Sequence, residues 1–311
     1  MLNRIALRLL RMVLTFWAIA TLVFFATRIS GNPIDYIMGE GMGAAEREMM
    51  IRYFRLDESI WSQYVAYLRG MLQGEFGLSL LERRPVVEVV ADRLWPTAQL
   101  LLASVAFTVA VAIPLGVIAA LGRGRLSGSV AMTMAFLGYA VPNFVLAVIL
   151  ILVFSYWLNW LPVVGNATPA HYVLPVLVMS GLMVGSLTRF TRNAMLDVLG
   201  QDFMRTARAK GLSEPVVILR HGLGNASLTI LSVIGLQVAT TAAAGSVVVE
   251  TIFAWPGIGE LLVGSAIRRD YPVLQFGVLT VALAVIVINA VVDLAYGWAD
   301  PRLRGGAAKP V

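Results

Sequence analysis

Six apolar stretches, each near or above the length that crosses a bilayer as a helix, dominate this sequence of 311 residues. A helix needs roughly 18 to 20 mainly apolar residues to span the hydrocarbon core of a membrane. We place the expected spans at residues 9–26, 97–121, 130–157, 172–187, 227–249 and 275–298. Since backbone polar groups in lipid must be satisfied within the chain, these stretches predict an all-α integral membrane protein with six transmembrane helices.

The composition agrees with a membrane protein. Hydrophobic residues make up 59% of the chain and charged residues 14%, whereas a soluble domain carries about 25% charged residues. The net charge of +6 is explained by cytoplasmic loops, which concentrate Arg and Lys in membrane proteins. We therefore expect membrane lipid around the chain and no nucleic-acid partner. With no cysteine and two histidines far apart in sequence, we expect no metal site.

Basic residues predict the orientation of the spans. Arg4, Arg8 and Arg11 precede the first span, which we expect to stay uncleaved with its N-terminus inside. The cytoplasmic segments are then the N-terminal arm, the loop at Arg123, residues 189–226 and the C-terminal tail, and all four are net basic. Because positively charged loops stay on the inner side, both termini are expected to be cytoplasmic.

The order of spans and polar segments predicts four parts of the chain. We divide it into an N-terminal span, an extracytoplasmic segment, a five-span core that includes loop 189–226, and a tail, at residues 1–28, 29–94, 95–304 and 305–311. In the extracytoplasmic segment, Ile60, Tyr64, Tyr67, Leu68 and Met71 approximate one apolar face of a helix. A small helical segment packed on the membrane face is therefore expected after the first span.

Residues 189–226 are the one long polar segment in the C-terminal two thirds of the chain. Leu199, Phe203 and Ala207 recur every fourth residue, so we expect them on one apolar helical face. Gly211 can adopt the left-handed conformation that ends a helix. The Ser-Glu-Pro sequence after it favours the start of a second helix. Two short helices joined by a tight turn indicate a docking element rather than a solvated loop.

A nucleotide-binding signature is absent from the sequence. The chain has only two lysines, Lys210 and Lys309, and neither follows the glycine-rich loop of the G-x-x-x-x-G-K-[ST] pattern that cradles phosphates. We therefore expect that this chain does not itself hydrolyse ATP by means of that motif.

Several sequence segments resemble one family of membrane proteins. Thr206-Ala-Arg-Ala-Lys-Gly-Leu-Ser-Glu, followed by Leu219-Arg-His-Gly-Leu-Gly-Asn-Ala, resembles the conserved cytoplasmic loop of ABC-importer permeases. Gly74-Glu-Phe-Gly-Leu-Ser and Arg269-Asp-Tyr-Pro-Val extend the match over nearly the whole chain. The sequence is similar to the B-type permease of the dipeptide/oligopeptide/nickel family. The general loop pattern begins Glu-Ala-Ala, where this chain has Arg205 and the following Thr-Ala.

The resemblance implies the type I ABC importer permease fold in a bacterial cytoplasmic (inner) membrane. It implies a transport subunit that is not an enzyme and binds no cofactor itself. Such a subunit forms half of a translocation path for di- or oligopeptides or a similar small solute. The implied partners are a second permease in a heterodimer, two ATPase subunits that bind ATP and Mg²⁺, and an extracytoplasmic solute-binding protein. The implied ATPase-coupling residues are Phe203, Arg205, Thr206, Ala207, Arg208, Ala209, Lys210, Gly211, Leu212 and Ser213.

The last two spans and the segment between them hold further candidate site residues. In the fifth span, residues of two kinds, polar and small, either line the pathway or pack helices together. These candidates are Gln237, Thr240, Thr241 and Gly245. Glu250 and Trp255 are candidates for docking the binding protein, with a structural role as the alternative.

Other functions stay open at this point. An ion-gradient-driven secondary transporter would need repeated halves and mid-membrane carboxylates. The sequence shows no repeat, and Asp293 is either an ion relay or a structural pair near the interface. A membrane scaffold would need no rigid docking element. Importers of nickel, glutathione or oligosaccharide can share the permease type that this sequence resembles.

Overall fold

The computed structural model describes residues 2–31, 48–49, 51–52 and 55–299. Within these residues the regular secondary structure is helical, and the β pairing is limited to one isolated antiparallel bridge between Leu78 and Pro85. The chain divides into two compact units, which are described separately. Unit 1 comprises Met1–Thr97 and Pro256–Ile286, and unit 2 comprises Ala98–Trp255 and Val287–Val311.

Five helical runs are long and apolar enough to cross a membrane, and one bent helix pair makes a sixth when counted as a single span. The five runs lie in α1 (Leu2–Ile29), α5 (Val86–Leu121), α8 (Ala170–Leu199), the run Glu214–Ala243 and α14 (Tyr271–Ala299). The bent pair is α6 (Leu126–Ala140) and α7 (Asn143–Leu150), which continues as the π-helix η1 (Ile151–Trp157). The expected all-α membrane fold with six spans is confirmed.

The third expected span is not a single straight helix, because the chain bends by 101° between α6 and α7. Pro142 lacks an amide hydrogen, and its ring disfavours the helical conformation of the residue before it. Val141 accordingly adopts an extended backbone with φ −93° and ψ 124°. The proline therefore ends α6 at Ala140 and starts α7 in a new direction.

Unit 1 contains the helix expected after the first span. Helix α4 (Ile60–Gln73) begins at Ser59, whose hydroxyl accepts a hydrogen bond from the Ser62 amide, and ends at Gly74 with φ 77°. Its aromatic residues pack on α1: the rings of Tyr64 and Tyr67 each lie 5.3 Å from that of Phe24. The Tyr64 hydroxyl also lies 2.7 Å from the Thr21 hydroxyl. The predicted aromatic face is thus the packing face, although Ile60 is exposed.

A buried aspartate joins two segments of unit 1 that are far apart in sequence. Asp270 lies between α13 (Ile258–Ile267) and α14, and only 2% of it is exposed. Its carboxylate accepts hydrogen bonds from the Ser79 hydroxyl at 2.5 Å and from the Leu80 amide at 3.2 Å. The two segments that carry the family resemblance in this unit are therefore held together by this carboxylate.

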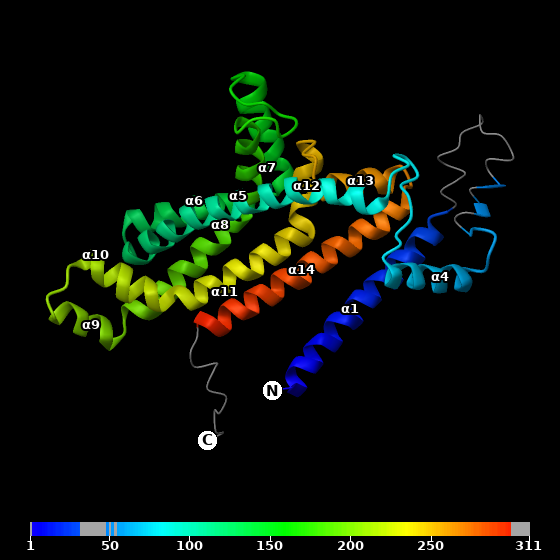
Figure 1. Cartoon of the computed structure of the whole chain (residues 1–311). Helices are drawn as coiled ribbons and strands as arrows, with labels where there is room; N and C mark the ends of the chain where they lie inside the picture. The colour runs from blue at the N-terminus through cyan, green and yellow to red at the C-terminus, as the bar shows by residue number, and fades with distance from the viewer. Residues whose placement is uncertain (1, 32–47, 50, 53–54, 300–311) are drawn as a thin grey trace. The chain divides into compact units, whose positions relative to one another are not determined.

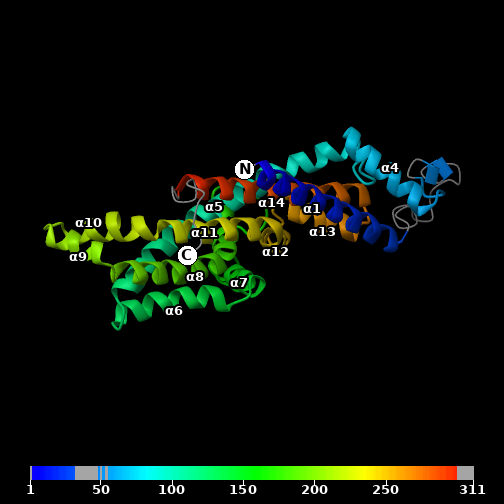
Figure 2. The ribbon, with the colours of Figure 1, turned by 90° about the horizontal axis from the view of Figure 1, so that it is seen from below.

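Unit 2 is built around α8, which packs against α6 and α11 (Gly224–Thr240). Figure 2 shows these three helices running side by side. A Cβ added to Gly185 would lie 2.5 Å from the Ala135 carbonyl oxygen, and one added to Gly138 would lie 2.8 Å from the Gly181 carbonyl oxygen. Small residues let helix backbones approach closely, so these glycines allow α6 and α8 to pack against each other.

Candidate functional site

The polar segment folds into a helical elbow at one end of unit 2 (Figure 1). Helix α8 continues to Leu199, and two short helices follow: α9 (Asp202–Ala209) and α10 (Glu214–Val216). Gly211 between them has φ 78°, the left-handed conformation predicted for the end of the first helix. The fifth span begins directly at α10 and continues through the π-helix η2 (Val217–Leu223) into α11.

The elbow has a small apolar core of its own. Met204 and Ala207 of α9 are 0% and 5% exposed, and they pack against Val217 of η2. Val198 and Leu199 at the end of α8 cover the same cluster. This core holds α9 against the start of the fifth span and the end of the fourth.

The predicted apolar face of α9 is wrong in one respect. Phe203 is 41% exposed, and Met204 is buried in its place. The helix is interrupted at Gly200 and Gln201, so the four-residue spacing counted from Leu199 does not continue into α9. The burial of Met204 was not predicted. Met204 lies three residues before Ala207, and this spacing places both residues on one side of a helix.

Four large apolar side chains of the elbow are exposed, and we call this set the elbow patch. It consists of Phe203, Leu212, Val216 and Leu219, which are 41%, 40%, 40% and 60% exposed. The Nε atom of Arg208 on α9 lies 2.7 Å from a carboxylate oxygen of Glu214 on α10 and thereby ties the two short helices together. An apolar surface with charged neighbours on a braced support is suited to contact another protein.

All ten predicted coupling residues lie in α9 or in the turn after it. All of them except Ala207 are exposed, and Ala207 belongs to the core of the elbow. Arg205 lies 3.8 Å from Asp202 one turn earlier in an exposed pair. Their contact with another subunit stays a prediction, because the structure contains this chain alone.

The predicted pathway residues lie toward the C-terminal end of the fifth span. Gln237 and Thr241 are partly buried, and the Gln237 side-chain amide donates to the Met183 carbonyl oxygen at 3.3 Å. Thr240 is exposed, and its hydroxyl bonds its own helix. From Thr241 to Gly245 the chain forms the π-helix η3. Such segments widen a helix and are frequent at functional sites, but lining of a pathway stays a prediction.

The two predicted docking residues are buried inside unit 2. Glu250 and Trp255 are both 0% exposed, and the Trp255 amide donates to the Glu250 carbonyl oxygen at 2.8 Å. The Trp255 ring meets the ring of Tyr172 edge to face at 4.6 Å. In this conformation the backbone hydrogen bond closes a turn and the buried side chains offer no surface, and their contact with a binding protein stays untested.

Two sequence predictions fall outside what the structure describes. Asp293 belongs to α14, but its side chain lies outside the described residues, and so does the tail at 305–311.

The hydrogen bonds that polar residues of α8 make to α5 in unit 2 were not predicted from the sequence. The Ser180 hydroxyl donates to the Ser104 carbonyl oxygen at 3.1 Å, and Thr188 donates to Ala112 at 3.4 Å. The eight-residue spacing of Ser180 and Thr188, which places both hydroxyls on one side of α8, was the available signal.

Fold and elbow together define a component of a membrane transport system. Residues 112–305 match the family model of the binding-protein-dependent transport system inner membrane component. The chain is 41% identical over 305 residues to the glutathione transport system permease protein GsiC of Escherichia coli (strain K12) and to GsiC of Shigella dysenteriae serotype 1. Each alignment covers 98% of this chain and 99% of the relative.

A solved structure shows the same fold. The inward-facing MetNI methionine ABC transporter aligns with a TM-score of 0.59 and 16% identity, over 70% of this chain and 98% of that chain. This chain belongs to the family of binding-protein-dependent transport system inner membrane components. It is a permease subunit of an ABC importer, with the expected type I fold, and it crosses the inner membrane several times.

The family assignment decides between the functions left open by the sequence. It favours ATP-driven import over ion-gradient-driven secondary transport and over a scaffold role, and it implies ATPase and permease partner subunits.

Proposed function

We propose that this chain forms half of the translocation path for glutathione or another short peptide. The observation that supports this solute class is the 41% identity to GsiC along 98% of the chain. Nickel chelates and oligosaccharides differ chemically from glutathione, the solute in the name of GsiC, so they are the less favoured alternatives. The second half of the path would come from a different permease, and a solute-binding protein would deliver the peptide.

The elbow supports a mechanism of energy coupling. In this proposal the elbow patch inserts into a cleft of a cytoplasmic ATPase subunit, and ATP with Mg²⁺ binds there and not on this chain. Closure of two ATPase subunits would then displace α9. Since Met204 and Val217 pack α9 against the spans, the displacement would tilt them between inward-open and outward-open states. A braced, two-state element can transmit such a movement, whereas a flexible tether cannot.

The test is a substitution in the elbow patch with a matched control. Phe203→Asp places a charge in the proposed contact, and Leu81→Asp places the same charge at a residue of similar exposure, 43% against 41%, in unit 1. We expect Phe203→Asp to abolish both co-purification of the ATPase subunits and ATP-dependent glutathione uptake in proteoliposomes. Leu81→Asp should retain both. Full co-purification and uptake by Phe203→Asp would refute coupling through the patch.

The solute is tested separately with the unmodified complex. ATP-dependent uptake of labelled glutathione that competes with short peptides is the expected result. Uptake of an oligosaccharide or a nickel chelate without peptide competition would reject the proposed solute class but leave the coupling proposal intact.

A further inference from the structure

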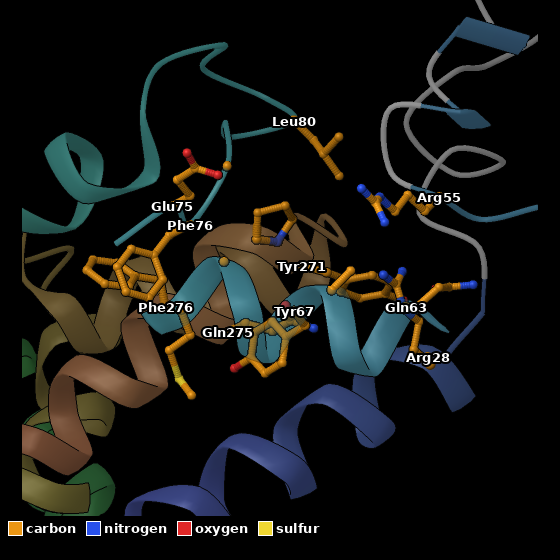
Figure 3. Close-up of a pocket in the computed structure, with 15 residues that line it drawn as sticks. Arg28, Arg55, Gln63, Tyr67, Glu75, Phe76, Leu80, Tyr271, Gln275 and Phe276 are labelled. Carbon is orange, nitrogen blue, oxygen red and sulfur yellow. The ribbon is translucent and has the colours of Figure 1, made fainter. Parts of the chain in front are cut away.

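A cavity of about 350 Å³ lies within unit 1 (Figure 3). Its walls come from the last turn of α1, from α4 and the loop after it, and from the first turn of α14. Ligand pockets in proteins begin at about 300 Å³, so the cavity can hold a chemical group of small-molecule size. It is far in sequence from the elbow and from the residues predicted to line the pathway.

The guanidinium of Arg28 lines this cavity without a hydrogen bond or ion pair in the described part of the chain. Its Nε atom is enclosed. Its Cζ atom lies 5.3 Å from the centroid of the Phe24 ring. Arginine stays protonated in proteins. A half-buried cation without an anionic partner is unfavourable, so the site is electrostatically incomplete.

Three further buried polar atoms, which have no hydrogen-bond partner among the described residues, belong to side chains that line the same cavity. They are the hydroxyls of Tyr67 and Tyr271 and the side-chain oxygen of Gln63. Burial, followed by the effect of nearby Tyr64, raises the pKa of Tyr67 to about 12, which keeps its hydroxyl a donor. Since most buried polar groups in proteins are paired, a cluster of unpaired ones indicates a missing ligand.

The charges along the cavity are unevenly distributed. Figure 3 shows Arg28 and Arg55 at one end and Glu75 at the opposite end. Arg55 is 3.8 Å from Glu58, a distance too long for a strong ion pair, and Glu75 is exposed to solvent. The end at Arg28 is therefore cationic and rich in hydrogen-bond donors, which is the environment that an oxyanion requires.

The cavity also lies where two membrane spans end. Arg28 is in the last turn of the apolar run Leu10–Ile29, and Tyr271 begins the run Tyr271–Val292. Residues at such positions lie at the level of lipid headgroups, where Arg and Tyr are favoured. A phosphate offers more acceptor oxygens than a carboxylate, and a guanidinium can bind two of them at once.

We propose that this cavity binds a phosphate group, with Arg28 as its counter-ion and Tyr67 and Tyr271 as hydrogen-bond donors. The phosphate belongs either to a phospholipid headgroup or to a soluble phosphate ester, and the two sources share this chemistry.

The test uses the full chain, purified in detergent with the subunits that accompany it and stripped of lipid. Phosphatidylglycerol, or diacylglycerol with the same acyl chains, would then be added back, and native mass spectrometry would measure how much of each the protein retains. Glycerol 1-phosphate would serve as the soluble probe. The variants are Arg28→Gln and Arg69→Gln. Arg69 is exposed on α4 and does not line the cavity, so it is a matched loss of charge.

We expect the unmodified protein to retain phosphatidylglycerol in preference to diacylglycerol, and Arg28→Gln to weaken retention about tenfold. Arg69→Gln should bind like the unmodified protein. Binding of glycerol 1-phosphate that depends on Arg28 supports the site and assigns a soluble source, whereas dependence seen with the lipid alone assigns the headgroup. Unchanged retention in Arg28→Gln, or equal losses in both variants, would overturn the proposal.

A second variant guards against misfolding of Arg28→Gln. The double substitution Tyr67→Phe and Tyr271→Phe removes two donors with almost no change in shape. It should weaken phosphate binding several-fold while the thermal unfolding temperature without ligand stays within a few degrees of the unmodified protein. Unweakened binding in the double variant would overturn the assigned donors.

Discussion

Two glycines flank helix α9, and they differ in backbone conformation. Gly211 has φ 78° and Gly200 has φ −83°, and an added Cβ would meet nothing within 4 Å at either residue. Space is therefore equal at the two sites, and only the left-handed backbone separates them. A non-glycine residue in that region costs about 1–2 kcal/mol, so the effect of conformation can be isolated from the effect of crowding.

We predict that Gly211→Val uncouples transport from ATP hydrolysis. The β-branched side chain disfavours the left-handed conformation, so the cap between α9 and α10 should rearrange and displace the elbow patch. ATP-dependent uptake in proteoliposomes should fall at least about tenfold, while the amount of membrane-inserted protein stays the same. Gly200→Val is the control and should transport normally. Normal uptake by Gly211→Val would contradict the lever mechanism.

At the same scale, residue spacing predicted the conformation of Gly211 but not the orientation of Phe203. A left-handed glycine follows from local chemistry, because few other residues tolerate that backbone. The exposure of Phe203 depends on where α8 ends. At that end Leu199 packs against the cluster that contains Met204 and Val217. This packing joins residues of three different helices, and a count of apolar spacing along one helix does not include such contacts.

Among the helices, close backbone contact decides where α6 and α8 lie. Gly185 faces the Ala135 carbonyl oxygen, whereas Gly264 of α13 would have open space around an added Cβ. Both glycines are inside helices. Gly185 is therefore required by helix packing, whereas Gly264 only lowers the stability of its helix.

We predict opposite stability effects for the same change in these two glycines. Gly185→Ala should destabilise the chain by about 1–3 kcal/mol, because the methyl group forces α6 and α8 apart. Gly264→Ala should stabilise it by roughly 0.5–1 kcal/mol, because alanine loses less backbone entropy in a helix. Thermal unfolding of the full chain in detergent measures both, and a stabilised Gly185→Ala variant would contradict the packing model.

The positions of the helices were predicted well from the sequence. The bends within them and the contacts between residues far apart in sequence were predicted less well. Apolar length located the spans, and Tyr64 and Tyr67 predicted the packing face of α4. The same count treated residues 130–157 as one span, although the backbone requirement of Pro142 bends the chain there by 101°. The cavity at Arg28 was not predicted at all, because Arg28, Tyr67 and Tyr271 come together only through the fold of unit 1.

For the molecule as a whole, the orientation in the membrane connects the two proposals. Coupling requires the elbow on the cytoplasmic side, where ATP is available, and the charge bias of the loops predicts that side. Helix α4 follows the first span and should therefore lie on the opposite side of the membrane. The structure contains no membrane, so this orientation is a prediction from sequence.

The absence of cysteine from the chain makes the orientation directly measurable. Single cysteines would be placed at Leu72 on α4, which is 85% exposed, and at Gln201 before α9, which is exposed and outside the predicted coupling residues. A membrane-impermeant maleimide should label Leu72→Cys in intact cells but label Gln201→Cys only after the membrane is opened. The unmodified chain provides a control without any reactive thiol. Labelling of Gln201→Cys in intact cells would place the elbow outside, and that result would exclude its contact with a cytoplasmic ATPase because no ATP-binding partner could reach it there.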